Sequence, residues 1–305
     1  MPELPEVNAY VEALDRLLAG RVLERVRLRS PSLLRTVDPP LGRVHGRTLR
    51  GFRRIGKRVV WELEDELFLV FHLMVTGRFH WKKPGARVPR KTGHAGFDFE
   101  HGTMLLTEVG RKKRAALHVV RGEAGLAAHD PGGLEPLEAD LDAFRAALVR
   151  ENRTLKRALT DPRILSGIGN AHSDEILLRA RLSPLQRTGN LSAPEVERLW
   201  RGTTEHLSEW VERLRAETDR GFPEKVTAFH PAMAVHGRFG EPCPTCGNAI
   251  QRIRYADRET NYCPVCQTDG RLLADRGLSR LLGDDWPATL EELEELRAAH
   301  GGPTD

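Results

Sequence analysis

The sequence predicts an α+β multidomain protein, with an N-terminal β-sandwich that begins with a helix and a C-terminal part made of helices and a small finger. Three observations lead to this fold class. Short strand-like segments occupy most of residues 22–120, helical periodicity takes over from residue 141, and all four cysteines lie between residues 243 and 266. A length of 305 residues is enough for two domains that each bury a hydrophobic core.

The N-terminal part combines one helix with many short strands. Apolar residues at helical spacing predict a helix over residues 5–18, and Gly20 ends it. Short segments bounded by Gly, Pro or charged residues follow, as in a sandwich or barrel. We expect strands at Val22–Leu28, Thr48–Ile55, Arg58–Leu63, Leu67–Phe71, Gly77–Trp81, Gly96–Phe99, Met104–Thr107 and Ala115–Val120. The Gly-rich stretch Gly122–Leu137 predicts a linker.

Helices follow this linker. We expect them at Leu141–Leu148, Leu155–Leu159 and Ala171–Ala180, then from a capping box of Ser192 and Glu195 to about Arg215, and finally at Pro287–His300. The segment Ser166-Gly167-Ile168-Gly169-Asn170 predicts a tight turn that leads into a helix N-terminus. Free backbone N–H groups at such a position suit a phosphate, although most turns of this kind only connect helices.

The charge of the chain is unevenly distributed. Lys and Arg number 47 against 43 acidic residues, a net charge of +4. Four Arg and eight acidic residues follow Gly270, so residues 1–270 carry a net charge of +8. A basic body with an acidic tail suits a nucleic-acid-binding protein without establishing one. No segment approaches the roughly 18 apolar residues of a membrane span, and the N-terminus has no signal-peptide pattern, so we expect a cytoplasmic protein without membrane contact.

The four cysteines form two C-x2-C pairs, separated by 16 residues: Cys243, Cys246, Cys263 and Cys266. This spacing is typical of a four-thiolate zinc site, with Arg252–Tyr262 as the intervening hairpin. Two structural disulfides or a redox motif are the alternatives, and a chain without a signal peptide disfavours disulfides. Because four thiolates leave no position for water, we expect one structural Zn²⁺.

The N-terminus carries a possible nucleophile. Pro2 follows the initiator Met1, whose removal leaves a secondary amine at the chain end. An α-amino group has a pKa near 8, so part of it is neutral at pH 7 and can attack a sugar C1′ to form an iminium. Glu3 is placed to move protons. Taken alone, these two residues favour a terminus without function.

Together the motifs resemble the Fpg/Nei family of DNA glycosylases. The resemblance rests on Pro2-Glu3-Leu4-Pro5-Glu6-Val7, the turn with Asn170, and Gly237-Arg238-Phe239-Gly240-Glu241-Pro242-Cys243 before the finger, and extends from residue 2 to about 267. It implies a monomeric, nucleoid-associated bacterial enzyme that acts on damaged double-stranded DNA. Such an enzyme removes oxidised bases of the formamidopyrimidine or 8-oxoguanine type through a Schiff base on the N-terminal proline, followed by β,δ-elimination.

The resemblance also implies domain boundaries. We expect a catalytic β-sandwich domain over residues 1–125 and a helix–two-turn–helix domain over 138–220. The zinc finger is expected over residues 234–268 and an acidic extension without assigned function over 269–305.

The resemblance assigns roles to individual residues. Pro2 matches the nucleophile and Glu3 the acid that assists sugar-ring opening and base loss. Lys57 matches a lysine that contacts phosphate and donates a proton, and Arg258 an arginine that grips phosphates and supports δ-elimination. The implied DNA contacts are His94, Arg111, Lys156 and Asn170. Glu6 matches a further acid near the site, or supports the first helical turn.

Two loops depart from the family pattern. In the Fpg branch, His-Leu-Gly-Met-Ser-Gly carries a wedge methionine and Asp-Pro-Arg-Arg-Phe-Gly carries an arginine and an aromatic residue. Here the loops are His72-Leu73-Met74-Val75-Thr76-Gly77 and Glu108-Val109-Gly110-Arg111-Lys112-Lys113-Arg114. Such side chains fill the gap left by a flipped base, so the preferred lesion stays open.

Two alternatives therefore remain beside the oxidised-purine enzyme. One is a Nei-like glycosylase for oxidised pyrimidines, and the other is a DNA-binding zinc protein whose chemistry has lapsed. In all of them we expect a basic groove floor that neutralises phosphates, built from Arg50, Arg53, Arg54, Lys57, Arg58 and the run Arg111–Arg114.

Overall fold

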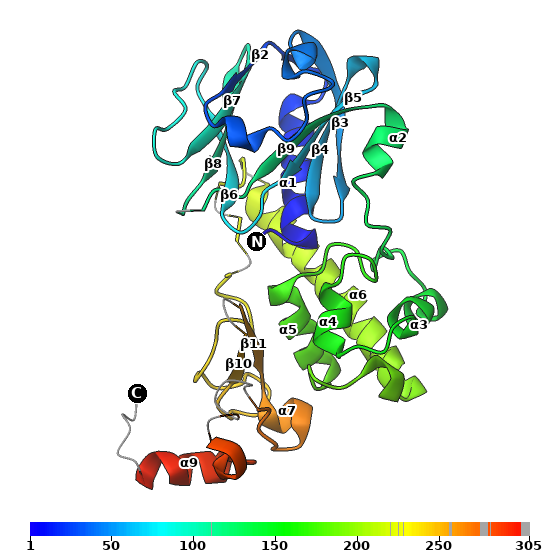
Figure 1. Ribbon diagram of the computed structural model, residues 1–305, viewed down its shortest axis with the longest axis vertical. Coiled ribbons are helices and arrows are strands. Elements are labelled where there is room, and N and C mark those ends of the chain that lie inside the picture. Colours follow the sequence, from blue (N-terminus) through cyan, green and yellow to red (C-terminus); the bar gives the residue numbers. More distant parts are fainter. Residues whose placement is uncertain are drawn as a thin grey trace. The chain divides into compact units, whose positions relative to one another are not determined.

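The computed structural model describes residues 1–110, 112–219, 221–224, 226–227, 229–255, 258–274, 280 and 282–299 (Figure 1). The chain forms two compact units. The first comprises Met1–Glu135, Ser166–Ile168 and Leu207–Ala228, and the second comprises the remaining segments. The division falls within the long helix α6 (Ala193–Thr218), which is thus shared between the units.

Two antiparallel sheets form the sandwich of the first unit. One has the order β1-β3-β4-β5-β9, with strands β1 (Val22–Leu23), β3 (Arg47–Ile55), β4 (Arg58–Leu63), β5 (Leu67–His72) and β9 (Ala116–Arg121). The other has the order β2-β7-β8-β6, with strands β2 (Arg25–Leu28), β7 (Gly93–Phe99), β8 (Gly102–Glu108) and β6 (Gly77–Lys82). The helices of this unit are α1 (Leu4–Leu18), α2 (Gly122–Ala127) and the last part of α6, and single 3-10 turns lie at Pro31–Leu33, Leu41–Val44 and Glu64–Glu66.

The expected strand Val22–Leu28 is wrong as a single element. Its first two residues pair with β3 in one sheet, and its last four pair with β7 in the other. Leu23 and Val26 are both buried although they are three positions apart, a spacing that a flat strand with period two cannot bury on one side. The chain therefore crosses from one sheet to the other at Glu24, whose N–H donates to Asp98 O.

The expected linker Gly122–Leu137 is also wrong in its first part, which forms helix α2. Leu126 is buried there and packs with Val60, Phe68 and Val70 on the five-stranded sheet. Four glycines and two prolines within the stretch conceal this apolar anchor from a composition argument.

An aromatic cluster joins the two sheets. Trp61 on β4 is fully buried, and its ring lies 4.9 Å from Phe71, 5.0 Å from Phe97 and 5.9 Å from Phe79, measured between centroids. Phe79 and Phe97 belong to the four-stranded sheet. Helix α1 adds its apolar face to this core, and the Tyr10 ring meets Phe79 edge to face at 5.5 Å.

Helices and a two-stranded hairpin make up the second unit. The helices are α3 (Leu141–Val149), α4 (Leu155–Thr160), α5 (Asn170–Ala180), the first part of α6, α7 (Pro264–Thr268) and α9 (Leu290–Ala299), with 3-10 turns at Thr188–Asn190 and Gly283–Asp285. The predicted capping box is confirmed, because the Glu195 carboxylate accepts the N–H and the O–H of Ser192, each at 2.8 Å. The hairpin pairs β10 (Gln251–Tyr255) with β11 (Arg258–Tyr262).

The segment after the finger is anchored to it. Leu273 N–H donates to the Tyr262 hydroxyl at 2.8 Å, and Leu272 N–H donates to Ala288 O at 2.7 Å, just before α9. The predicted helix at Pro287–His300 is thus confirmed over Leu290–Ala299. Within the part of the chain that the structure describes, no helix combines the length and apolar character needed to cross a membrane.

Replacing the central aromatic ring tests this core. We expect Trp61→Ala to lower the free energy of unfolding by about 3–5 kcal/mol, because it leaves a cavity between the sheets. Urea unfolding followed by circular dichroism measures the change. Val37→Ala, at a position 90% exposed, is the control and should change stability by less than about 0.5 kcal/mol. Equal effects of the two substitutions would contradict a core centred on Trp61.

Candidate functional site

The first turn of α1 places two acidic residues in the interior. Glu3 is 2% exposed and Glu6 is fully buried, and Pro2 beside them is also buried. Glu3 is the N-cap of α1, and its N–H donates to the Glu6 carboxylate at 2.8 Å. This bond fulfils the supporting role considered for Glu6, since a carboxylate in the first turn satisfies a helix N–H that has no other partner.

The Gly-rich turn holds this first turn of the helix in place. Leu4 N–H donates to Gly167 O at 2.9 Å. Gly167 has a φ of +78°, and a Cβ on it would lie 2.8 Å from the Leu4 Cβ. Only glycine combines this backbone conformation with so close an approach. The turn therefore positions the residues around Pro2 in addition to leading into α5.

The electrostatic surroundings of the N-terminus include groups of both signs. Burial lowers the pKa of the Met1 amino group below its ordinary value. Glu3 and Glu6 act to raise this pKa, whereas Arg78 and Lys57 act to lower it. Lys57 of the β3–β4 turn and Glu3 thus both influence the charge of this terminus.

Arg54 fixes the hairpin that carries Lys57. Its guanidinium donates to Gly56 O at 2.9 Å and to the Asn8 side-chain oxygen at 3.0 Å, and it forms an ion pair with Glu135. Three elements of the first unit therefore meet at one side chain, and the position of the Gly56–Lys57 turn depends on it.

Three of the cations expected in the groove floor form ion pairs within the protein. Arg50 pairs with Glu64 at 2.9 Å, Arg53 pairs with Glu62 at 2.7 Å, and Arg54 pairs with Glu135. A carboxylate held this close offsets part of the guanidinium charge and competes with a phosphate for its hydrogens. The partners are distant in sequence, so the basic run alone does not reveal them.

His72 belongs to this region although sequence reasoning missed it. It ends β5 opposite Arg58, and its Nδ1 accepts the Met74 N–H at 3.2 Å. Burial, with Arg58, Lys57 and His118 nearby, lowers the pKa of His72 to about 4. The imidazole is therefore neutral at pH 7 and retains one N–H donor. His72 directly precedes the loop Leu73–Gly77, whose sequence differs from the family pattern, and this position could have identified it from the sequence.

His94 is not placed to contact DNA. It is 1% exposed, and its Nε2 lies 2.8 Å from the Glu108 carboxylate. The same carboxylate accepts the N–H groups of Arg114 at 3.0 Å and Ala115 at 3.1 Å. This pair of buried side chains therefore shapes the base of the loop after β8, and the predicted DNA contact of the His94 side chain is not available at the surface of the described residues.

Two aliphatic side chains lie at the tips of the two loops whose sequences differ from the family pattern. Val75 is 51% exposed and Val109 is 64% exposed, and the Thr76 hydroxyl donates to Val109 O at 2.5 Å. The predicted contact Arg111 lies outside the described residues. Within the described part of these loops, apolar side chains thus stand at the tips beside the cations Lys112 and Arg114.

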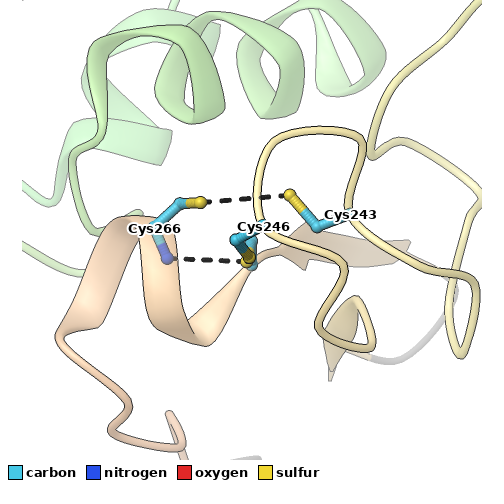
Figure 2. A group of neighbouring side chains, drawn as sticks. Cys243, Cys246 and Cys266 are labelled. Carbon is cyan, nitrogen blue, oxygen red and sulfur yellow. Dashed lines mark hydrogen bonds between the residues drawn. The ribbon is translucent and has the colours of Figure 1, made fainter.

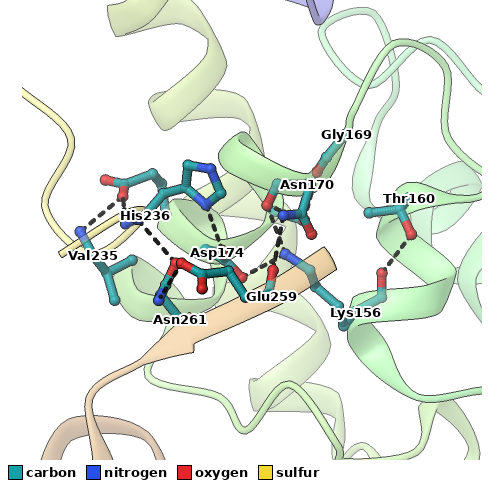
Figure 3. A network of polar contacts seen from close by, with 12 residues as sticks. Lys156, Thr160, Gly169, Asn170, Asp174, Val235, His236, Glu259 and Asn261 are labelled. Atoms are coloured by element: carbon teal, nitrogen blue, oxygen red, sulfur yellow. Dashed lines mark hydrogen bonds and ion pairs between the residues drawn. The ribbon is translucent and has the colours of Figure 1, made fainter. Parts of the chain in front are cut away.

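In the second unit, Lys156 and Asn170 lie in one polar network (Figure 3). The Lys156 ammonium donates to Asn170 O at 2.6 Å and to Asp174 at 2.5 Å. The Asn170 amide donates to Glu259 O at 2.8 Å. An ammonium carries three hydrogens, so Lys156 keeps one for another partner.

Two neighbouring carboxylates of α5 hold the segment before the finger. Asp174 accepts from His236 Nδ1 at 2.8 Å, and Glu175 accepts the backbone N–H groups of residues 234–236, each at 2.8 Å (Figure 3). Asn261 on β11 accepts the Gly237 N–H at 2.9 Å. Helix α5 and the finger are therefore bound through several well-formed hydrogen bonds.

Arg258 begins β11 and pairs with Tyr255 across the hairpin, whereas its side chain lies outside the described residues. Because Asn170 holds the carbonyl of Glu259, the structure brings the Asn170 turn next to the strand that starts with Arg258. The sequence places these two residues 88 positions apart and gives no sign of this contact.

The four cysteines converge on one point (Figure 2). Their sulfur atoms all lie within 4.8 Å of one another, with Cys243 to Cys266 at 3.9 Å and Cys246 to Cys263 at 3.4 Å. A tetrahedral zinc with Zn–S bonds of about 2.3 Å needs sulfurs about 3.8 Å apart. The donor set and its spacing fit one structural Zn²⁺, and the two predicted disulfide or redox alternatives do not require such convergence.

Family models and curated relatives match this arrangement. Residues 1–115 match the Formamidopyrimidine-DNA glycosylase N-terminal domain, residues 133–219 the Formamidopyrimidine-DNA glycosylase H2TH domain, and residues 240–268 the zinc finger found in FPG and IleRS. The formamidopyrimidine-DNA glycosylase of Geobacter metallireducens is 35% identical over 272 residues, which are 88% of this chain and 100% of the relative. The chain belongs to the formamidopyrimidine-DNA glycosylase family.

Other members agree with this assignment. The enzyme of Heliobacterium modesticaldum is 33% identical, over 88% of this chain and 100% of its own length. A Lactococcus lactis FPG mutant solved with a Fapy-dG containing DNA superposes with a TM-score of 0.78 at 26% identity, over 88% of this chain and 100% of that chain. The Lactococcus enzyme in complex with an abasic site containing DNA superposes with the same TM-score, over 87% of this chain and 99% of that chain.

The family's modules coincide with the structural elements. The H2TH model spans α3 to α6, and the finger model spans the hairpin and α7, so the four cysteines are the ligands of an FPG-type zinc finger. The segment from Arg271 to α9 lies beyond the finger model.

Filling the Gly167 position tests how the first turn is held. We expect Gly167→Ala to lower the free energy of unfolding by about 1–3 kcal/mol through backbone strain and overpacking against Leu4. The Leu4 amide should also exchange its hydrogen faster, as measured by hydrogen–deuterium exchange. Gly42→Ala is the control, because a Cβ there meets no atom within 4 Å. Unchanged exchange at Leu4 would contradict the positioning role.

Proposed function

We propose that this chain is a bifunctional DNA glycosylase and AP lyase that excises oxidised bases from duplex DNA. The observation that carries the proposal is the buried Pro2–Glu3 pair at the start of α1, with Lys57 acting on the same terminus. Family membership and solved relatives in complex with Fapy-dG containing and abasic DNA support it.

The nucleophile requires removal of Met1. The Pro2 nitrogen is part of a peptide bond while Met1 is present, and it becomes a secondary amine only afterwards. An α-amine with a pKa near 8 or below is partly neutral at pH 7. The surroundings that lower the pKa of the Met1 amino group, burial and the cations Arg78 and Lys57, favour the neutral nucleophilic form at this terminus.

The proposed reaction proceeds through an iminium. The Pro2 nitrogen attacks C1′, Glu3 assists ring opening and departure of the base, and the resulting iminium acidifies the C2′ hydrogen. Its removal breaks the bond to the 3′ phosphate, and a second elimination releases the 5′ phosphate. We propose that Lys57 donates a proton in the first elimination and that Arg258 supports the second.

The remaining predicted residues serve DNA binding in this proposal. Lys156 and Asn170 present the N-terminus of α5 to a phosphate, and Arg111 is a further DNA contact. The His94–Glu108 pair acts by shaping that loop. We propose that the protein works as a monomer on nucleoid DNA, with the four module boundaries 1–125, 138–220, 234–268 and 269–305.

Oxidised pyrimidines are the second candidate substrate class. A Lactococcus lactis FPG bound to an oxidized pyrimidine containing DNA superposes with a TM-score of 0.77 at 25% identity, over 88% of this chain and 100% of that chain. In addition, the aliphatic tips Val75 and Val109 offer no hydrogen bonds to an orphaned base, which weakens discrimination of the opposite base.

Borohydride trapping on abasic-site duplex DNA tests the chemistry. We expect a covalent adduct with protein that has lost Met1, because borohydride reduces the iminium. Pro2→Gly should abolish or shift this adduct, whereas Glu3→Gln should still trap abasic DNA while base excision falls by about 10²–10⁴-fold. N-terminal mass spectrometry identifies the molecules that retain Met1, which should not react.

The same assay separates the enzyme from a lapsed DNA-binding protein. An adduct that survives Pro2→Gly unchanged contradicts the assigned nucleophile. Absence of any adduct, with duplex binding preserved, contradicts the enzymatic function as a whole.

A cleavage panel decides the substrate class. Duplexes with formamidopyrimidine, 8-oxoguanine, thymine glycol and uracil-derived lesions are each paired with the four opposite bases. We expect the formamidopyrimidine and 8-oxoguanine duplexes to be cleaved fastest, with less than about tenfold variation among opposite bases, because the apolar tips read no base edge. Faster cleavage of thymine glycol than of either purine lesion would assign the chain to the oxidised-pyrimidine class.

A further inference from the structure

We propose that an arginine-lined cleft on the first unit is an additional binding site for the phosphates of duplex DNA, distinct from the N-terminal site. The cleft has a volume of about 620 Å³ and lies between β2 and the loop that joins β6 to β7. Its lining consists of Arg27, Leu28, Arg29, Arg87, Val88 and Arg90, without an acidic side chain. The inference rests on the proposed function, since its ligand is the substrate DNA.

Arg27 forms the floor of the cleft. Its guanidinium makes two hydrogen bonds to the Asp98 carboxylate, at 2.6 and 2.8 Å, and a third to Ala86 O at 2.7 Å. The charge of Asp98 is therefore engaged by Arg27, and the third bond ties the β6–β7 loop to β2. Arg27 therefore has a structural role in the cleft, and we assign the binding of an anion to the neighbouring arginines.

The loop is packed firmly against β7. A Cβ on Gly93 would lie 2.4 Å from a Val88 methyl group, and a Cβ on Gly96 would lie 3.2 Å from the other methyl group. The Gly93 N–H donates to Pro89 O at 3.0 Å. Two glycines thus let Val88 lie directly on the strand, and the flanking Arg87 and Arg90 are presented from a fixed backbone.

Three arginines of the cleft retain their charge for a ligand. Arg29, Arg87 and Arg90 are exposed, and among the residues that the structure describes none of them forms an ion pair with a carboxylate. This distinguishes them from Arg50, Arg53 and Arg54, which form ion pairs. Guanidinium groups bind phosphate oxygens in a bidentate manner, and unpaired like charges in one hollow repel each other until an anion binds.

Duplex DNA is the phosphate source that the observations favour. Arg29, Arg87 and Arg90 come from two chain segments and line one cleft, and several guanidinium groups in one place suit neighbouring phosphates of one DNA duplex better than a single ion. The unit that bears them also carries the Pro2–Glu3 site, so a bound duplex is already a ligand of this unit in the proposed function. In this proposal the cleft contacts only the sugar–phosphate backbone of the DNA, so it contributes to affinity without a preference for base sequence.

Salt-dependent binding tests the cleft. The triple variant R29A/R87A/R90A is compared with wild type on a duplex with a stable abasic-site analogue. Each lost phosphate contact lowers the slope of log K against log salt by about 0.9, so the slope should fall by about 2–3 and the affinity at 0.1 M salt by about tenfold or more. The triple variant R21A/R43A/R121A removes three exposed, unpaired arginines of the same unit outside the cleft and should keep the wild-type slope.

The outcomes are distinct. An unchanged slope in R29A/R87A/R90A, or an equal loss in both triple variants, overturns the proposal. The variant R29K/R87K/R90K keeps the charges and should restore most of the slope, which excludes a folding defect as the cause. Borohydride trapping by the wild-type protein on a duplex with a natural abasic site, which can form the iminium, reports the proposed function separately, so its failure is distinguishable from failure of the cleft.

Discussion

The backbone hydrogen bond from Leu4 to Gly167 is the constraint on which the N-terminal site depends. A chain terminus is normally mobile, because fixing its backbone costs about 1–2 kcal/mol per residue in conformational entropy. Here the capping of Glu3 by Glu6, the apolar face of α1 and the Gly167 carbonyl together offset that cost. The result is a buried terminus whose nitrogen has a defined position, as a nucleophile requires.

Carboxylates decide which cations of this basic protein remain available to DNA. Arg50, Arg53 and Arg54 belong to ion pairs that fix strands and the Lys57 hairpin, whereas Arg29, Arg87 and Arg90 of the cleft form no ion pair within the described residues. Net charge alone does not separate these two groups. A similar division exists in the second unit, where Lys156 stabilises Asp174 and the N-terminus of α5 with two of its three hydrogens.

Much of the fold follows from local patterns in the sequence. The stripe of α1, the capping box of α6 and the cysteine spacing each depend on residues a few positions apart, and all three predictions are confirmed. The failures involve distant partners: the strand that changes sheets at Glu24, the helix anchored by Leu126, and His94, whose partner Glu108 comes from the next strand. The assigned roles of Pro2, Lys57 and Arg258 stay predictions, because geometry positions a group without showing that it reacts.

The contact between Asn170 and Glu259 has a consequence for the metal. The zinc-bound knuckles set the position of β11, and β11 offers the carbonyl that the Asn170 amide holds. The Asn170 turn and the finger are therefore joined by a direct hydrogen bond, although only the finger contains metal ligands. Cys263 directly follows β11, so a metal held by the four cysteines would fix one end of the strand that supports the Asn170 turn.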